Sequence, residues 1–225
     1  MAARERYRSG ARLYDLLSLE RPVYGGARIA ALELLAARPG QRVLDLGCGT
    51  GLNHPLLHAA VGAGGRVLGV DRSAEMLEVA RRRARRHGLS SVRLLQSDAT
   101  ALDAERAIAE LGGAADLVVA TYTLSIMSDP AVAWVRALDA AAPDARLAIV
   151  DMQRPRGLLW PVGPLLAAFA RFGGSDLEAR PWTLIEDAAD DVVARSFWGG
   201  HIQVRAGVRR GDPGLRIPPH GRLSS

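Results

Sequence analysis

The sequence predicts a single doubly wound α/β domain, in which a mostly parallel seven-stranded sheet ends in a C-terminal antiparallel hairpin. Short apolar runs alternate with amphipathic segments of helical length, which favours a parallel sheet with helices on both faces. The first apolar run leads directly into a glycine-rich loop, and the last two flank Gly199-Gly200, a pair typical of a tight hairpin. With 225 residues and 48% hydrophobic content, the chain can bury such a sheet.

The expected elements follow from these runs and from the residues that start or stop them. An apolar helix is stopped by Arg38-Pro39-Gly40, Ser73 can cap a later helix, and Pro130 can open another. Helices are expected at residues 27–37, 52–61, 74–86 and 131–142. Strands are expected from Val43 into the glycine loop and at residues 66–70, 92–96, 116–120, 146–150, 192–198 and 201–208.

Residues 43–51, Val-Leu-Asp-Leu-Gly-Cys-Gly-Thr-Gly, are the most informative stretch. Glycines at alternate positions permit positive φ, so we expect a sharp turn whose amides stay open to a ligand and whose following helix directs its positive end into the same crevice. A dinucleotide fingerprint would need glycine where Leu52 stands, and a phosphate loop would need a lysine. The loop therefore favours a ligand that carries amine and hydroxyl donors.

Acidic residues lie at the ends of three of the expected strands. Asp45 precedes the glycines, Asp71 lies twenty residues beyond Gly51, and Asp98 comes just after the strand at 92–96. Each alone is typical of a turn or a cap, but the carboxyl ends of parallel strands share one edge of a sheet. Together with the loop, these residues predict a ligand site in which a carboxylate can accept both hydroxyls of a ribose.

Residues 43–51, the run Asp71-Arg72-Ser73-Ala74-Glu75-Met76-Leu77 and the triplet Ser97-Asp98-Ala99 resemble the motifs of class I S-adenosylmethionine-dependent methyltransferases. The resemblance implies a Rossmann-like fold and S-adenosyl-L-methionine as cofactor. It places the loop backbone against the methionine part, Asp71 on the ribose, Asp98 and the Ala99 amide on the adenine edge, and Met76 on the adenine face. A cationic sulfonium also suits carboxylates. The expected cofactor-binding residues are Asp45, Gly47, Cys48, Gly49, Gly51, Asp71, Arg72, Met76, Ser97, Asp98, Ala99 and Thr121.

The acceptor side is expected at the ends of the fourth and fifth strands. Tyr122 follows the fourth strand, and Asp151, which ends the fifth, could orient an amine or hydroxyl. Tyr14 belongs to an N-terminal segment that folds over the site in this family, although a helix-packing aromatic is an alternative. These three are the expected catalytic residues. His54 is interpreted as a polar residue at a helix start, with a base as the alternative, and His201 as structural.

A looser resemblance concerns the acceptor. Tyr14-Asp15, Tyr-Thr-Leu-Ser at 122–125, Asp151-Met152, and Phe172-Gly173-Gly174 with Arg180-Pro181-Trp182 resemble bacterial phospholipid and betaine-lipid N-methyltransferases. The ubiquinone/menaquinone C-methyltransferases come next. A small or amphiphilic acceptor is expected, with N-methylation of a lipid headgroup amine. The alternatives are C- or O-methylation of a quinone-like or other small metabolite, and a cofactor-binding sensor or partner subunit that transfers nothing.

The domain organisation follows from these assignments. Residues 1–39 form an expected helical lid segment, 40–208 the cofactor-binding domain, and 209–225 a disordered tail rich in Pro, Gly and Arg. Within the domain, the substrate-side insert at 158–182 holds an apolar stretch at 158–170, for which a lid over an acyl or prenyl chain and a core helix are both open.

Charge and composition limit the partners and the location. The net charge is +5, and five arginines lie within residues 81–86; a solvated helix face is favoured, with peripheral contact to an anionic membrane as the alternative. Nucleic acid is not expected, because residues 121–124 lack a base-flipping tetrad. A single cysteine, no apolar signal segment and no membrane-spanning run indicate the cytoplasm. No metal site is expected, because Met152-Gln153 follow Asp151.

Overall fold

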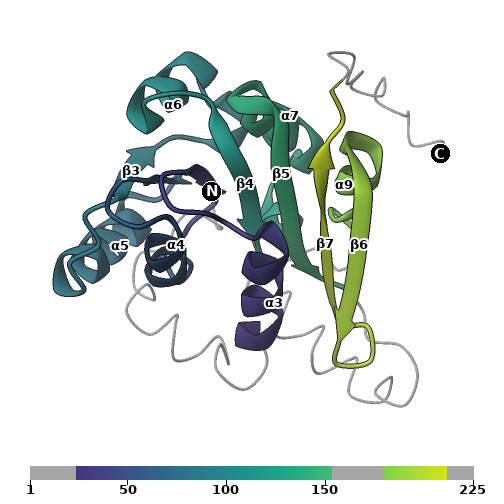
Figure 1. Ribbon diagram of the computed structural model, residues 1–225. Helices are drawn as coiled ribbons and strands as arrows, with labels where there is room; N and C mark the ends of the chain where they lie inside the picture. The colour runs from purple at the N-terminus through teal and green to yellow at the C-terminus, as the bar shows by residue number, and fades with distance from the viewer. Residues whose placement is uncertain (1–23, 154–179, 212–225) are drawn as a thin grey trace.

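The computed structural model describes residues 24–153 and 180–211, which form a seven-stranded sheet in the order β3-β2-β1-β4-β5-β7-β6. The first five strands are parallel, whereas β7 runs antiparallel to both β5 and β6 (Figure 1). This confirms the predicted fold class. The strands are β1 (Arg42–Leu46), β2 (Arg66–Asp71), β3 (Val92–Gln96), β4 (Ala115–Thr121), β5 (Ala141–Met152), β6 (Ala189–Phe197) and β7 (Ile202–Arg209).

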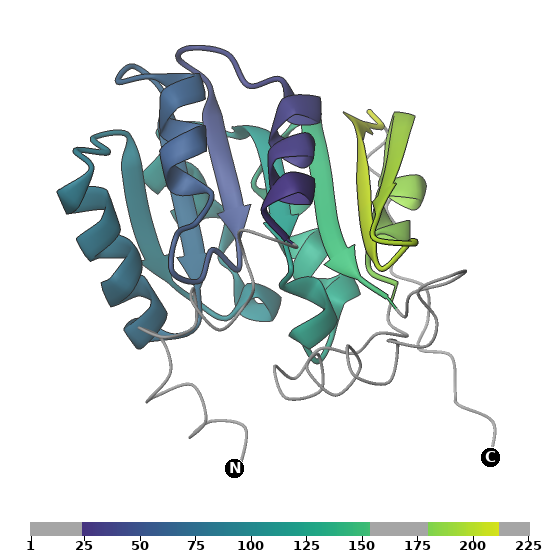
Figure 2. The ribbon, with the colours of Figure 1, turned by 90° about the horizontal axis from the view of Figure 1, so that it is seen from below.

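Helices cover both faces of the sheet (Figures 1 and 2). One layer consists of α3 (Gly25–Leu35), α4 (His54–Val61) and α5 (Ala74–Arg86), and the other of α6 (Ala104–Leu111), α7 (Pro130–Asp139) and α9 (Thr183–Ala188). Each layer encloses its own apolar cluster against the strands, one containing Leu57 and the other Trp134 and Ile185. Two short 3-10 turns, η2 (Ala99–Ala101) and η3 (Leu124–Ile126), follow β3 and β4.

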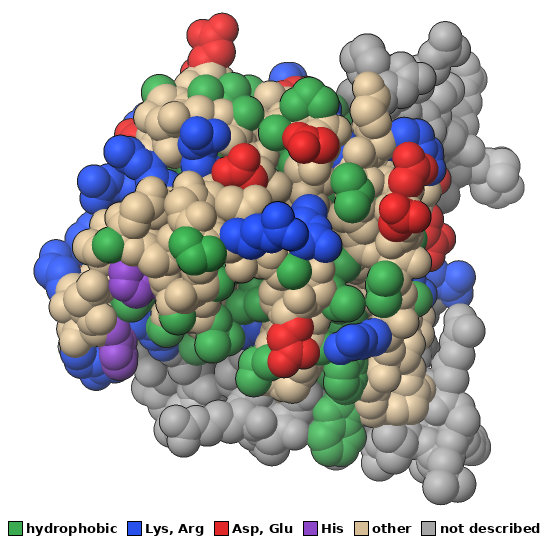
Figure 3. Space-filling model, viewed as in Figure 1, with side chains coloured by type: hydrophobic (Ala, Val, Ile, Leu, Met, Phe, Trp, Pro, Cys, Tyr) green, Lys and Arg blue, Asp and Glu red, His purple; other side chains and the backbone are tan. Residues whose placement is uncertain are grey.

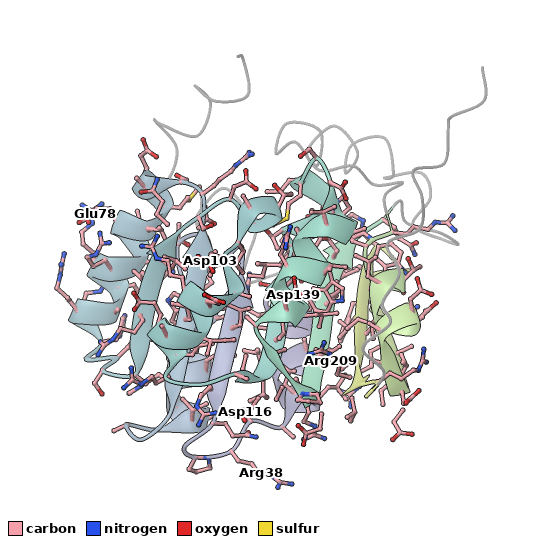
Figure 4. All side chains as sticks on the ribbon, turned by 90° about the horizontal axis from the view of Figure 1, so that it is seen from above. Arg38, Glu78, Asp103, Asp116, Asp139 and Arg209 are labelled. Carbon is pink, nitrogen blue, oxygen red and sulfur yellow. The ribbon has the colours of Figure 1, made fainter. Side chains whose placement is uncertain are left out.

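Side-chain caps explain where several helices begin. The Ser73 hydroxyl accepts a hydrogen bond from the Met76 amide at 3.2 Å, as expected from the sequence. Asp103, labelled in Figure 4, caps α6 through the Arg106 amide at 3.2 Å. Asp129 caps α7 through the Val132 amide, and the proline that follows it occupies the first turn. Each cap satisfies an amide that a helix start leaves without an intrahelical partner.

The structure differs from the sequence prediction at several boundaries. The helix expected from residue 52 begins at His54, because the Gly51 and His54 amides bond within the preceding turn. The helix expected to reach residue 142 ends at Asp139, and β5 begins at Ala141, five residues before the expected strand. The α6 and α9 helices were not predicted.

Arg209 explains why the alanine-rich stretch after α7 leaves the helix. Its guanidinium donates to the carbonyls of Leu138 and Ala141 at 2.9 and 2.8 Å, next to the C-terminus of α7 (Figure 4). These contacts satisfy carbonyls that a continuing helix would use internally. They also show that Arg209, expected in the disordered tail, belongs to β7.

Several expectations fall outside the described residues. Tyr14, the lid segment up to residue 23, the apolar stretch at 158–170 and the tail from 212 onward all belong to this group. Of the insert at 158–182, only the last three residues are described. Trp182 among them is 4% exposed and belongs to the core cluster that also contains residues of α7 and α9. Across 24–153 and 180–211, no helix has the length and apolarity needed to span a membrane.

Candidate functional site

The three glycines after β1 all adopt positive φ, at +66° for Gly47, +54° for Gly49 and +77° for Gly51. A Cβ atom on Gly47 would overlap the side chain of Thr123, and one on Gly51 would meet the imidazole of His54. A Cβ on Gly49 would meet nothing within 4 Å. Two of the glycines are therefore required by packing, and Gly49 leaves open space beside the backbone.

The amides of this loop are already hydrogen-bonded. Cys48 donates its amide to the Val70 carbonyl at 2.9 Å, Gly49 to the Asp71 carboxylate at 2.8 Å, and Gly51 to the Cys48 carbonyl at 2.9 Å. The expectation of open amides is therefore wrong for these three. A loop whose donors are engaged is a poor cradle for phosphate, and this agrees with a ligand that is cationic near the loop.

Asp71 is the last residue of β2, and each of its carboxylate oxygens accepts a hydrogen bond from one backbone amide. Oδ2 accepts from Gly49, and Oδ1 accepts from Ser73 at 2.9 Å. The side chain is half-buried, and this burial raises its pKa, opposed by the two amide bonds. An ionised carboxylate has about four acceptor sites, so two remain for ligand hydroxyls. Arg72, the next residue, is exposed.

Asp98 lies beyond β3, the neighbour of β2, and is exposed. Its Oδ1 accepts from the hydroxyl and the amide of Thr100, at 2.8 and 2.9 Å, and these bonds lower its pKa. Ser97 bonds through its amide to the Asp71 carbonyl at 3.1 Å, which joins the two strand ends. Ala99, in η2, and Met76, in the first turn of α5, are both buried.

Asp45 is placed differently from the other two carboxylates, because it is fully buried beneath the loop. Its Oδ1 accepts from the Asn53 amide group at 2.8 Å, and its Oδ2 lies 3.4 Å from His54 Nε2. His54 is also fully buried, at the first position of α4. Burial and the nearby carboxylates of Asp45 and Asp71 raise the pKa of the Cys48 thiol, which fits the interpretation of Cys48 as a space-filling residue.

Arg28, on α3, is a site residue that the sequence did not single out. Its guanidinium donates to Asn53 Oδ1 at 2.6 Å and to the Thr121 hydroxyl at 2.8 Å, and it lies 5.4 Å from the ring centroid of Tyr122. With 8% of its surface exposed, this arginine links α3 to the start of α4 and to the end of β4. An arginine within an otherwise apolar helix segment was the signal that could have identified it.

An aromatic cluster lies at the carboxyl ends of β4 and β5, consisting of Tyr24, Tyr122, Met152 and His201. The Tyr24 and Tyr122 rings meet edge to face at 5.1 Å, and the Tyr122 hydroxyl donates to the Tyr24 carbonyl at 2.7 Å. Tyr122 has a φ of +55°, a strained conformation for a bulky residue. Its amide donates to the Val150 carbonyl at 2.7 Å, which helps to hold that conformation.

Asp151 is fully buried at the end of β5, where its hydrogen bonds hold the turn η3 that follows β4. Its carboxylate accepts from the Ser125 amide at 2.9 Å, from the Ser125 hydroxyl at 2.6 Å and from the Met152 amide at 2.9 Å. Burial raises its pKa to about 6, although these bonds oppose the rise. Both oxygens are thus occupied within the protein, so the geometry supports a positioning role more than the expected contact with an acceptor.

The basic surface of α5 is partly structural. Blue side chains gather over α5 in Figure 3, at the left of the view. Arg81 and Arg85 lie 2.7 and 3.6 Å from Glu78, whose pKa they lower, whereas Arg83 donates to the Thr50 carbonyl in the glycine loop. In the described ranges, no group of three or more His, Cys, Asp and Glu residues could hold a metal ion.

Comparison with known proteins agrees with this geometry. Residues 37–171, more than half of the chain, match the family described as a methyltransferase domain. The chain is 37% identical over 148 residues to 2-phytyl-1,4-naphtoquinone methyltransferase of Synechococcus elongatus, covering 62% of this chain and 55% of that protein. It is 35% identical over 161 residues to nocamycin O-methyltransferase of Saccharothrix syringae, covering 69% and 53%. The chain thus spans about half the length of these relatives.

Solved structures show the same fold. A methyltransferase from Aquifex aeolicus, described as dependent on S-adenosylmethionine, has a TM-score of 0.64 and 21% identity, with 89% of this chain and 97% of that one covered. Phosphoethanolamine N-methyltransferase 2 of Haemonchus contortus, bound to S-adenosyl-L-methionine, has a TM-score of 0.66 and 16% identity, with 92% and 58% covered. The family model, which matches more than half of the chain, shows that the chain belongs to the methyltransferase-domain family of class I, whose methyl donor is S-adenosyl-L-methionine.

Proposed function

We propose that this protein transfers the methyl group of S-adenosylmethionine to a small acceptor that carries a flat hydroxylated ring of the quinol type. The observation that carries the proposal is the aromatic cluster beside the glycine loop. Thr123, which packs on Gly47, directly follows Tyr122, so the acceptor-side rings adjoin the loop. Aromatic and thioether side chains provide the apolar surface on which a planar ring packs well.

The donor site in this proposal uses the carboxyl ends of β1, β2 and β3. Asp71 accepts the ribose hydroxyls with the lone pairs that its amide partners leave. The open space at Gly49 admits the methionine part of the cofactor, while Asp98 and the Ala99 amide bind the edge of the adenine ring. Asp45 acts through Asn53 and the loop that it supports. The remaining expected contacts, proposed on their position alone, are Arg72, Met76, Ser97 and Thr121.

Transfer requires alignment more than strong acid or base chemistry. The acceptor atom attacks the sulfonium methyl in line with the C–S bond, whose electron pair returns to sulfur. Holding the two reactants in that geometry can contribute about 7–11 kcal/mol. Tyr122 and the turn fastened by Asp151 lie where the acceptor must approach, at the end of β4.

The naphthoquinone and nocamycin methyltransferases support the quinol-type acceptor, because their names indicate ring-containing or oxygen acceptors. A lipid headgroup amine remains the alternative drawn from the sequence. The carboxylate expected to orient that amine, Asp151, has both oxygens engaged with Ser125 and Met152. A sensor that binds the donor without transfer is the non-enzymatic alternative.

A turnover assay separates these functions. The purified protein is given labelled S-adenosylmethionine with either 1,4-naphthoquinol or phosphatidylethanolamine vesicles, and S-adenosylhomocysteine is measured. We expect product with the quinol and none above background with the vesicles. Product only with the vesicles would establish the amine. Donor binding by calorimetry, with no product from a wider panel of phenols and amines, would identify a sensor.

A further inference from the structure

The antiparallel course of β7 brings an imidazole to the acceptor edge of the sheet. Parallel strands β4 and β5 end at this edge, whereas β7 begins there, so Met152 and Ile202 pair across the two strands. His201 stands immediately before β7 and next to Gln153, the residue that follows β5. Its ring centroid lies 6.3 Å from that of Tyr24, which in turn contacts Tyr122.

Hydrogen bonding fixes the two ring nitrogens of His201 in different roles. Nδ1 lies 2.5 Å from the Gln153 carbonyl oxygen, and since a carbonyl can only accept, Nδ1 carries the proton. Nε2 is then an acceptor in the neutral ring. This atom is buried, and among residues 24–153 and 180–211 it has no hydrogen-bond partner; His201 as a whole is 1% exposed. A buried polar atom without a partner is uncommon and requires an explanation.

The geometry points to His201 as a catalytic residue whose Nε2 accepts the proton of the acceptor's hydroxyl group during methyl transfer. This inference rests on the proposed function. As the hydroxyl oxygen, or the ring carbon that it activates, bonds to the methyl carbon, the C–S bond breaks with its electron pair going to sulfur. The released proton goes to Nε2. The products are S-adenosylhomocysteine, the methylated acceptor and a protonated imidazole, which returns its proton to water.

The surroundings of His201 keep the imidazole neutral. Its pKa is lowered by burial, and the bond to Gln153 opposes the change. The charged side chains described on the neighbouring elements include Asp151 on β5 and Arg28 on α3, which are engaged with Ser125 and Thr121. They also include two ion pairs, Arg205 on β7 with Glu186 on α9 and Arg195 on β6 with Glu33 on α3. Tyr24 and Tyr122 are the nearby phenols. A neutral base is therefore present at neutral pH.

Two substitutions separate the two nitrogens. His201→Asn places an amide donor near the Nδ1 position, so the bond to Gln153 can persist, and it removes Nε2. His201→Gln places a polar group near Nε2 that can accept a hydrogen bond but takes no proton. His58→Asn is the matched control, because His58 is a part-buried histidine in the last turn of α4, bonded to Ser91 and away from the acceptor edge.

The experiment measures turnover of 1,4-naphthoquinol from pH 5 to 9, quinol binding in the presence of S-adenosylhomocysteine, and donor binding. For His201→Asn we expect kcat reduced at least a hundredfold, donor affinity unchanged, and loss of the acid limb that the wild-type kcat shows below its imidazole pKa. His201→Gln should restore the wild-type KM while kcat stays low. His58→Asn should match the wild type.

The outcomes distinguish the inference from the function on which it rests. If the wild type methylates the quinol and His201→Asn keeps both its kcat and its acid limb, the catalytic role of His201 is refuted while the proposed function stands. If the wild type binds the donor but neither binds nor methylates the quinol, the proposed acceptor is wrong, and the inference is refuted with it. Circular dichroism of each variant shows whether a loss of activity reflects unfolding.

Discussion

The carboxyl ends of β1–β3 and the ends of β4–β5 with the start of β7 share one edge of the sheet, but they are built in different ways. The first region takes its polar groups from short motifs, each within a few residues of a strand end. The second brings together Tyr24, Tyr122 and His201 from three distant parts of the chain. The first region, the proposed donor side, is thus a local construction, and the second region, the proposed acceptor side, depends on the tertiary fold.

The same difference is visible in the hydrogen bonds. On the donor side, Asp71 and Asp98 accept from residues close in the sequence or in the adjoining loop. On the acceptor side, the Tyr122 hydroxyl reaches Tyr24 across 98 positions, and Arg28 reaches Thr121 across 93. Changes in the donor half should therefore act mainly on cofactor binding, and changes in the acceptor half on packing and acceptor use. Gly47 is the exception, because it joins the two halves.

The largest effect is expected from Gly47→Ala. The new methyl group would occupy the space of the Thr123 side chain, and its backbone would be strained at a φ of +66°. Overpacking and strain together should cost about 2–4 kcal/mol of the free energy of unfolding, measured in urea. Gly49→Ala, at a φ of +54° but with open space, is the matched control and should cost only about 1 kcal/mol.

Equal losses of stability in the two glycine variants would contradict the packing argument. Donor binding sharpens the contrast: Gly49→Ala should weaken it at least tenfold while the fold remains, because its methyl group fills the space assigned to the cofactor. Normal donor binding by Gly49→Ala would remove the loop from the donor site.

The next effect concerns Asp151 and pH. Its folded-state pKa of about 6 exceeds the unfolded value of 3.8, so its contribution to stability is complete below about pH 4 and is lost as the pH rises through 6. The loss should amount to about 3 kcal/mol of unfolding free energy. Asp151→Asn lacks this titration, so the stability difference between wild type and variant should shift in the variant's favour between pH 4 and 7. Parallel curves for the two proteins would show that Asp151 does not titrate in this range.

The sequence predicted much of the local structure around the proposed donor half, because its signals are local. The sharp glycine turn, the Ser73 cap and the order of strand and helix all depend on neighbouring residues, and the structure confirms them, but the loop amides expected to be open are engaged in hydrogen bonds. Asp45 shows the limit of that approach. It was grouped with Asp71 and Asp98 by its position at a strand end, but burial beneath the loop gives it Asn53 and His54 as neighbours.

The acceptor half could not be assembled from the sequence, because its contacts join residues far apart. In the sequence, His201 was interpreted as a structural residue at the start of a strand. The antiparallel pairing of β5 and β7 places it beside Gln153 and Tyr24. The boundary between α7 and β5 was missed for the same reason. An alanine-rich stretch has high helix propensity, and the guanidinium that ends this helix comes from β7.

Donor affinity gives the third prediction. Asp71→Ala should remove charge-assisted bonds to the ribose, worth about 1.5–3 kcal/mol, and so weaken S-adenosylmethionine binding at least tenfold by calorimetry. Asp103→Ala is the matched control, because it also removes a carboxylate that accepts a backbone amide near a helix start, but on α6. Both variants should lose some stability, and only the first should lose donor affinity. Wild-type affinity in a folded Asp71→Ala protein would exclude the ribose contact.

The smallest effect is expected on the acceptor side, from Tyr122→Phe. The ring and its contact with Tyr24 remain, but the hydrogen bond to the Tyr24 carbonyl is lost, which should cost about 0.5–1.5 kcal/mol of unfolding free energy. Because this bond anchors the start of α3 to the end of β4, the KM for 1,4-naphthoquinol should rise while the affinity for S-adenosylmethionine stays within twofold. If donor affinity fell as much as acceptor affinity, the two halves would be one coupled site, and the distinction between a local donor region and a tertiary acceptor region would fail.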